Sequence, residues 1–124
     1  MPEILKGDKR YNLEERTAKF GEDVIELCKS VKISVINQSI ISQLIRSATS
    51  IGANYMEANG ASSRKDFANK IHICKKEAQE SKHWLRMLAK TNPEAKEKIS
   101  ELWKECQELT MIFAKIALSA RSNA

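Results

Sequence analysis

The sequence is poor in the residues that break or turn a chain. Only two prolines, Pro2 and Pro93, and four glycines occur among its 124 residues. An all-β fold needs many turns, so this shortage argues against one. No apolar run approaches the roughly 20 residues that cross a bilayer, and the first residues, MPEILKGDKRYN, lack the apolar core of a signal peptide. We therefore expect a soluble, cytoplasmic protein that makes no contact with a membrane.

Cysteine is also scarce and follows no motif. Cys28, Cys74 and Cys106 are odd in number and show neither a CxxC pair nor another metal-ligand spacing. This usage is typical of reduced thiols in a bacterial cytoplasm, and on apolar helix faces such residues usually serve as small buried packing groups. A Gly-rich phosphate loop and a nucleophile elbow are both missing. The sequence therefore predicts no enzymatic activity and no cofactor.

Two histidines and two glutamates are the remaining candidates for a metal site. His72 and His83 are 11 residues apart, which is about 16 Å along a helix and too far to chelate one ion. A carboxylate di-iron bundle uses Glu-x-x-His on two helices, whereas here Glu80-x-x-His83 occurs once. We therefore predict no metal, and expect Glu77 and Glu80 to pair with Arg46 or a nearby lysine.

What the sequence has in abundance is helical periodicity. Apolar residues recur three and four positions apart, and this spacing predicts helices over about 13–32, 39–59, 64–90 and 93–120. The predicted N-caps are Asn12, Ser39, Ser63 and Asn92. The segment 33–38 is rich in β-branched residues but has no strand to pair with, so we interpret it as a connection. The predicted fold class is all-α, with residues 1–124 forming a single antiparallel up-and-down four-helix bundle.

Three of these helices carry an apolar face that is predicted to form the core. On the first helix it consists of Leu13, Phe20, Val24, Leu27, Cys28 and Val31. On the second it consists of Ile41, Leu44, Ala48, Ile51 and Tyr55, and on the third of Phe67, Ile71, Cys74, Ala78, Ser81, Leu85 and Leu88. We expect the two tryptophans, Trp84 and Trp103, in the bundle core or an interface rather than as base-stacking platforms.

The charge of the chain is concentrated on the third helix. The formal net charge is +5, and residues 64–90 alone carry eight Lys or Arg against three Asp or Glu. Seven of these basic residues share one arc of about 120° beside the core, together with both histidines. The seven are Arg64, Lys65, Lys75, Lys76, Lys82, Arg86 and Lys90. A solvated face, which is the alternative, usually interleaves acids for pairing, so this one-signed face indicates RNA or DNA bound through its phosphates.

The second helix has almost no charge. Arg46 and Glu57 are the only charged residues in 39–59, and with Ser50 and Asn54 they form a face away from the core. A small polar face predicts close packing against another helix or another subunit, with Arg46 and Glu57 desolvated there and paired or hydrogen-bonded. Packing within the protomer alone is the alternative. In either case the role of this face is architectural.

Residues 43–58, QLIRSATSIGANYMEA, resemble the signature helix of the four-helix-bundle family encoded by intervening sequences in bacterial 23S rRNA genes. Residues 63–67 (SRKDF) and 76–85 (KEAQESKHWL) resemble its third helix, and the similarity extends over about 12–120. One departure is Ala58, where many members have glycine. The resemblance implies a homopentamer without enzymatic activity. It assigns a structural role to Arg46, Ser50, Asn54, Glu57, Glu77 and Glu80.

A related branch of that family, the accessory variability-determinant proteins, accompanies the reverse transcriptase of diversity-generating retroelements as a basic, nucleic-acid-binding pentamer. Together with the charge distribution, this predicts an oligomeric nucleic-acid-binding accessory module, which would recognise structured RNA by its shape and backbone. A protein partner such as a reverse transcriptase is a further expectation. The alternative is a purely protein-interacting oligomeric scaffold, whose basic face is solvated or meets an acidic partner.

Overall fold

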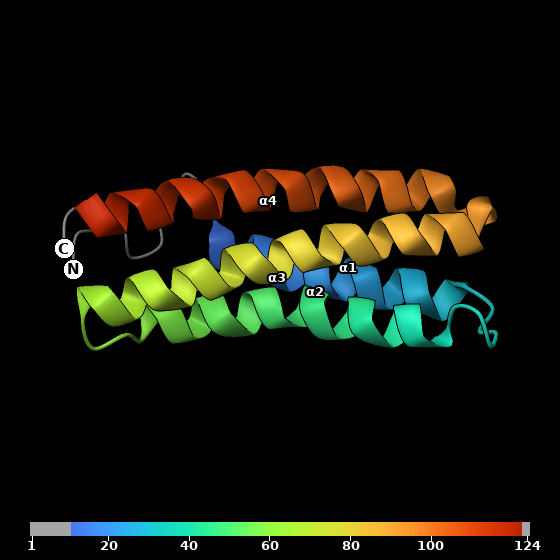
Figure 1. The fold of residues 1–124 in the computed structure, drawn as a ribbon, viewed down its shortest axis with the longest axis horizontal. Helices are drawn as coiled ribbons and strands as arrows, with labels where there is room; N and C mark the ends of the chain where they lie inside the picture. The colour runs from blue at the N-terminus through green and yellow to red at the C-terminus, as the bar shows by residue number, and fades with distance from the viewer. Residues whose placement is uncertain (1–10, 123–124) are drawn as a thin grey trace.

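The computed structural model describes residues 11–122, with side chains up to residue 120. Its elements are α1 (Leu13–Ser30), α2 (Gln38–Asn59), α3 (Arg64–Thr91), the 3-10 turn η2 (Pro93–Ala95) and α4 (Lys96–Ser122). Each long helix runs back alongside the one before it (Figure 1). The all-α class is therefore confirmed, and the described residues form an up-and-down bundle with no strand.

The core lies where the apolar periodicity predicts it. Every predicted core residue of α1, α2 and α3 is at most 7% exposed, and α4 adds its own buried face, which includes Leu109 and Phe113. The ring of Tyr55 on α2 lies 6.1 Å from that of Phe113 on α4, so aromatic packing joins two helices that are not neighbours in sequence. Among the described residues, no helix combines the length and apolar character that a membrane span requires.

Small residues bring α1 and α2 close together. A Cβ atom added to Gly52 would lie 3.3 Å from the Thr17 hydroxyl, and one added to Gly21 would lie 3.6 Å from Thr49. On the other side of α1, Arg16 reaches α4, where its guanidinium donates to Glu105 over 2.7 Å. The first helix is therefore held by close backbone contact on one side and by a charged contact on the other.

Of the predicted helix caps, Ser39 is wrong, and Asn12 is confirmed in position but not in its capping bond. Asn12 occupies the N-cap position of α1 in a left-handed conformation, with φ 47° and ψ 51°, and its side chain makes no capping bond. Ser39 lies inside α2, because that helix begins at Gln38. By contrast, Ser63 is confirmed as a cap, since its hydroxyl accepts from the backbone N–H of Asp66 over 3.0 Å.

Some predicted boundaries move as well. The first helix ends at Ser30 rather than near 32, because the backbone is already extended at Val31. The fourth begins with η2 rather than with a full α-helical turn. Asn92 precedes η2 as predicted, but its side chain makes no capping bond to the backbone there. Residues 1–10 and 123–124 of the predicted single domain lie outside the described residues.

The connection between α1 and α2 is fixed by a buried asparagine. Asn37 is 1% exposed, and its side chain accepts from the N–H of Ser34 over 2.8 Å. Its amide donates to the carbonyl of Lys32 and to the side chain of Asn92, each over 2.9 Å. The predicted connection is thus an ordered loop tied to the end of α3. This loop exposes three β-branched side chains, Ile33, Val35 and Ile36, at 64%, 95% and 73%.

Candidate nucleic-acid interface

The seven basic residues predicted to contact nucleic acid all lie on α3, over most of its length. Lys75 and Lys82 are half-buried, and the other five are exposed. We call this set the basic surface. Because α3 packs against both α2 and α4 through its core face, the basic surface lies on the outside of the bundle, adjacent to α4.

Negative charge is separated from this surface. In the described part of the chain, no salt bridge forms at Lys65, Lys75, Lys76, Lys82, Arg86 or Lys90. Two of the three acids on α3, Glu77 and Glu80, lie on its α2 side, where both contact Arg46. These six cations are therefore left without a salt bridge to the described residues.

An aromatic residue borders the basic surface, although the sequence did not indicate it. Lys82 lies with its Nζ 5.4 Å from the ring centroid of Trp103 on α4 and donates a hydrogen bond to Gln107. Trp103 is 38% exposed, so it is neither a core residue nor covered within one chain. Trp103 lies at the edge of the buried face of α4. The exposed fraction of a side chain at such a position depends on how closely the neighbouring helix packs, which the sequence does not give.

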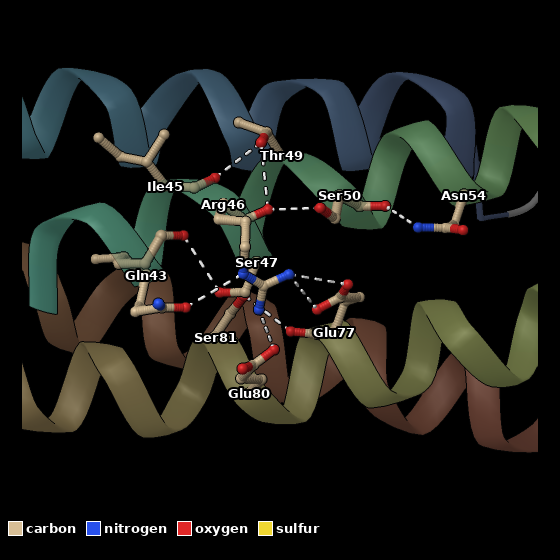
Figure 2. Close-up of polar contacts among 11 residues, drawn as sticks. Gln43, Ile45, Arg46, Ser47, Thr49, Ser50, Asn54, Glu77, Glu80 and Ser81 are labelled. Atoms are coloured by element: carbon tan, nitrogen blue, oxygen red, sulfur yellow. Dashed lines mark hydrogen bonds and ion pairs between the residues drawn. The ribbon is translucent and has the colours of Figure 1, made fainter. Parts of the chain in front are cut away.

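On the opposite side of α3, the predicted structural residues form a polar cluster with Arg46 at its centre (Figure 2). Arg46 donates to Glu77 over 3.2 Å, and also to Glu80. Beside it, Ser50 donates to the Arg46 carbonyl over 2.6 Å, and Asn54 donates to the Ser50 carbonyl over 2.8 Å. These two side chains therefore bond to their own helix. Five of the six predicted structural residues are joined by these contacts, namely Arg46, Ser50, Asn54, Glu77 and Glu80, and Glu57 lies apart from them.

The cluster affects the titration of its members. Burial works to raise the pKa of Glu80, but the hydrogen bond from Arg46 and the positive charge of that guanidinium outweigh burial and leave the pKa below its usual value. The pKa of Arg46 is raised, first by its hydrogen bond to Glu80 and then by that to Glu77. Both groups are therefore charged at neutral pH. Behind them, Ser81 donates to Ser47 over 2.8 Å in the buried contact between α2 and α3.

Arg46 and Glu57 are both paired, as predicted, but each with residues of α3 rather than with each other, and neither is buried within the single chain. They are 11 residues apart on one helix, about 16 Å along its axis, so their side chains cannot meet. Glu57 instead accepts from Lys70 of α3 over 2.8 Å. In the single chain the side chains of Arg46 and Glu57 are 45% and 57% exposed. Helical periodicity correctly predicted that Arg46 and Glu57 share one face of α2. Which residues of α3 they contact depends on the position of α2 along α3, and periodicity does not give that position.

The three cysteine thiols are buried, and burial suppresses their ionisation. Burial raises the pKa of Cys28 to about 11 and that of Cys74 and Cys106 to about 12. Such thiols stay protonated, and Cys106 donates to the carbonyl of Ala78 over 3.0 Å. Among the described residues, no group of three or more His, Cys, Asp or Glu is placed to hold a metal ion.

Similarity to known proteins covers most of the chain. A family model, described as 23S rRNA-intervening sequence protein, matches residues 9–115. Among solved structures, the chain is similar to the crystal structure of a protein of unknown function from the S23 ribosomal protein family of Bacteroides thetaiotaomicron. The two are 31% identical with a TM-score of 0.73, and the match covers 84% of this chain and 96% of that one. No curated protein matches.

Proposed function

Because this chain belongs to the 23S rRNA-intervening sequence protein family, we propose that it is a non-enzymatic accessory protein that binds RNA. It contacts the RNA through the basic surface of α3 and assembles from identical subunits. The observation that carries the proposal is the row of six cations from Lys65 to Lys90 that form no salt bridge with the described residues. Phosphates are the ligands that such a row attracts, and they supply affinity without base recognition. The names of the family and of its solved relative, which refer to ribosomal RNA and to ribosomal proteins, favour RNA over other polyanions.

Geometry supports binding along the axis of α3. The basic residues follow that helix from Lys65 to Lys90, 25 positions apart, which corresponds to about 38 Å at 1.5 Å per residue. A row of this length spans many phosphates of a nucleic-acid strand. Salt screens the attraction between such a row and phosphates, so the affinity should fall as the ionic strength rises.

The test is RNA affinity as a function of salt, measured by fluorescence anisotropy. Each phosphate neutralised contributes about 0.7–0.9 to the slope of log Kobs against log salt. Changing Lys75, Lys76 and Arg86 to Gln should therefore flatten the slope by about 2–3. Lys19, Lys29 and Lys98, changed to Gln in a control protein, remove the same charge from α1 and α4. The control should keep the wild-type slope. If wild-type protein binds neither RNA nor DNA at ~50 mM salt, the proposal fails.

Self-association is the second part of the proposal. In the single chain, the outer face of α2 is accessible, and beside it a groove of about 390 Å³ runs between α1 and α2, with Ile25 and Met56 among its residues. These two side chains are 38% and 58% exposed. A second copy would cover them, and a repeated contact of this kind closes into a ring. The ring of five comes from the family resemblance. Light scattering should give a multiple of 14.0 kDa; the monomer mass at micromolar concentration would contradict it.

One observation favours the alternative function, a protein-interacting scaffold. The ordered loop between α1 and α2 exposes Ile33, Val35 and Ile36 at the end of the bundle. These apolar side chains cannot bind phosphates, but they can contact a protein. If nucleic acid does not bind while the oligomer forms, this loop becomes the first candidate for a partner contact. Changing Val35 to Ser should then reduce capture of that partner and leave the oligomer mass unchanged.

A further inference from the structure

The edge of the basic surface that faces α4 differs from the rest because it combines cations with a partly exposed aromatic ring, that of Trp103. Lys75, Lys82 and Arg86 follow this edge at spacings of seven and four residues, so they share one line along α3. Trp103 of α4 meets that line at Lys82, whose Nζ lies 5.4 Å from the centre of the ring. We call this line, together with Trp103 and Gln107, the α3/α4 seam.

Beyond the Lys75 end of the seam, a hollow lies between the start of α3 and the end of α4. It has a volume of about 210 Å³ and is lined by Ala68, Asn69, His72 and Ala117. The alanines leave the space open, while Asn69 and His72 supply an amide and an imidazole at its rim. Both polar residues are exposed. Lys75 follows His72 by three positions and therefore lies on the same side of α3. The hollow thus offers hydrogen-bonding groups within a turn of a phosphate-binding cation.

The distance between these two features suits a polynucleotide. Trp103 and Ala117 are 14 residues apart on α4, about 21 Å along the helix axis. A stacked strand advances about 3.4 Å per nucleotide, so roughly six nucleotides cover this length. For comparison, one OB fold, a common single-strand-binding domain, covers about 4–16 nucleotides.

The chemistry distinguishes a single strand from a duplex. Phosphates are available on both, but the flat face of a base is free to stack on an indole only when it has left the base stack. Paired RNA would contact the lysines and leave Trp103 unused. An unpaired strand would use the ring and the cations together, because bases and phosphates alternate along it.

We propose that the α3/α4 seam binds an unpaired polynucleotide strand, with one base stacked on Trp103 and the adjoining phosphates on Lys75, Lys82 and Arg86. A second base enters the hollow beside His72. This proposal rests on the nucleic-acid-binding function proposed above and specifies which form of nucleic acid is bound. It applies to single-stranded RNA and DNA alike, since the base faces and phosphates are common to both. The loop of an RNA hairpin would present the same groups.

The test uses the fluorescence of Trp103. In a Trp84→Phe protein, Trp103 is the single tryptophan, and titration with a 12-nucleotide oligo(U) or oligo(dT) should quench it. A 12-base-pair duplex at the same phosphate concentration should quench it much less and bind at least tenfold more weakly. In the converse protein, Trp103→Phe, the remaining Trp84 should show little change. Circular dichroism establishes that each variant keeps its helix content.

Affinity measurements supply the second arm. Trp103→Ala should weaken oligo(U) binding by about 5- to 150-fold, the usual effect of removing a base-stacking aromatic, and should leave duplex affinity and the salt slope unchanged. Met111→Ala is the matched control, because Met111 is an apolar residue of α4 that is 62% exposed and outside the seam. Trp103→Phe should restore much of the lost affinity.

The outcomes separate this inference from the proposed function. Equal affinity for oligo(U) and duplex, with no effect of Trp103→Ala, would overturn the seam proposal while RNA binding by the basic surface stands. Failure to bind either nucleic acid would remove both. A Trp103→Ala protein that binds RNA normally but no longer self-associates would assign the exposed indole to subunit contact instead, and so would also overturn the proposal.

Discussion

Replacing Asn37 by alanine tests how far one buried side chain orders the α1–α2 loop. The substitution removes three hydrogen bonds, to the N–H of Ser34, the carbonyl of Lys32 and the side chain of Asn92. A hydrogen bond of this kind contributes about 1 kcal/mol net. Lys32 and Ser34 are exposed, so water replaces part of what they lose. Asn92 is 9% exposed and is compensated less.

The expected loss is therefore about 2–3 kcal/mol in the free energy of unfolding. At roughly 4 °C per kcal/mol for a domain of this size, the melting temperature should fall by about 8–12 °C. Urea unfolding followed by circular dichroism at 222 nm measures the free energy directly. Asn69→Ala is the control, since this exposed asparagine of α3 makes no hydrogen bond through its side chain in the described part of the chain, and its free energy should change by less than about 0.5 kcal/mol.

The loop itself provides a second measurement. If Asn37 orders it, hydrogen exchange at Ser34 should accelerate in the variant much more than exchange in the middle of α3. A free-energy change below about 0.5 kcal/mol for Asn37→Ala, with unchanged exchange at Ser34, would contradict the reasoning. The loop would then owe its conformation to the positions of the two helix ends alone.

Three further predictions concern stability. Glu57→Ala removes an exposed salt bridge, worth about 0–1 kcal/mol, so its melting temperature should stay within about 4 °C of wild type; a larger fall would place Glu57 in a desolvated subunit contact. Gly21→Ala should raise the free energy of unfolding by about 0.5–1 kcal/mol, because the new methyl group meets Thr49 at 3.6 Å, an ordinary contact; destabilisation would show that α1 and α2 cannot yield. The lowered pKa of Glu80 means that its pairing with Arg46 stabilises the fold above the ordinary carboxyl pKa of 4.5 and is lost as pH falls through the lowered value. The difference in melting temperature between wild type and Arg46→Met should therefore shrink below about pH 4.5, and a constant difference down to pH 2 would exclude the carboxylate as its cause.

The core could be predicted from the sequence because it depends on local spacing. An apolar face with a period near 3.6 residues is buried wherever the helix packs, so Phe20, Ile51 and Leu85 needed no knowledge of their neighbours. Ser63 was predictable for a similar reason, since its partner Asp66 is three residues away. The missing capping bond at Asn12 and the start of α2 before Ser39 were not predictable, because capping needs a particular backbone conformation that the rest of the fold imposes.

The polar contacts between helices could be predicted only in part. Pairing of Glu77 and Glu80 with Arg46 was one of two options and is confirmed, whereas the contact of Asn37 with Asn92 was not predicted. Arg46 and Glu77 are 31 residues apart, and Asn37 and Asn92 are 55 apart. A shift of one turn between two helices, 5.4 Å, would give each of them another partner. The exposed position of Trp103 depends likewise on the distance from α4 to α3. Sequence spacing therefore identified the faces of the helices, and the structure identified which residues on those faces meet.

The three buried cysteines make the protein convenient for experiments on its own unfolding. Cys28, Cys74 and Cys106 belong to α1, α3 and α4 respectively, and each is protonated and shielded from solvent in the folded bundle. A maleimide can react with one of them only after the helix that carries it has opened. The rate of labelling at each position, resolved by mass spectrometry, would show whether the bundle opens one helix at a time or all together. A cysteine introduced at an exposed site would react long before the native three, so a fluorophore could be attached without first removing them.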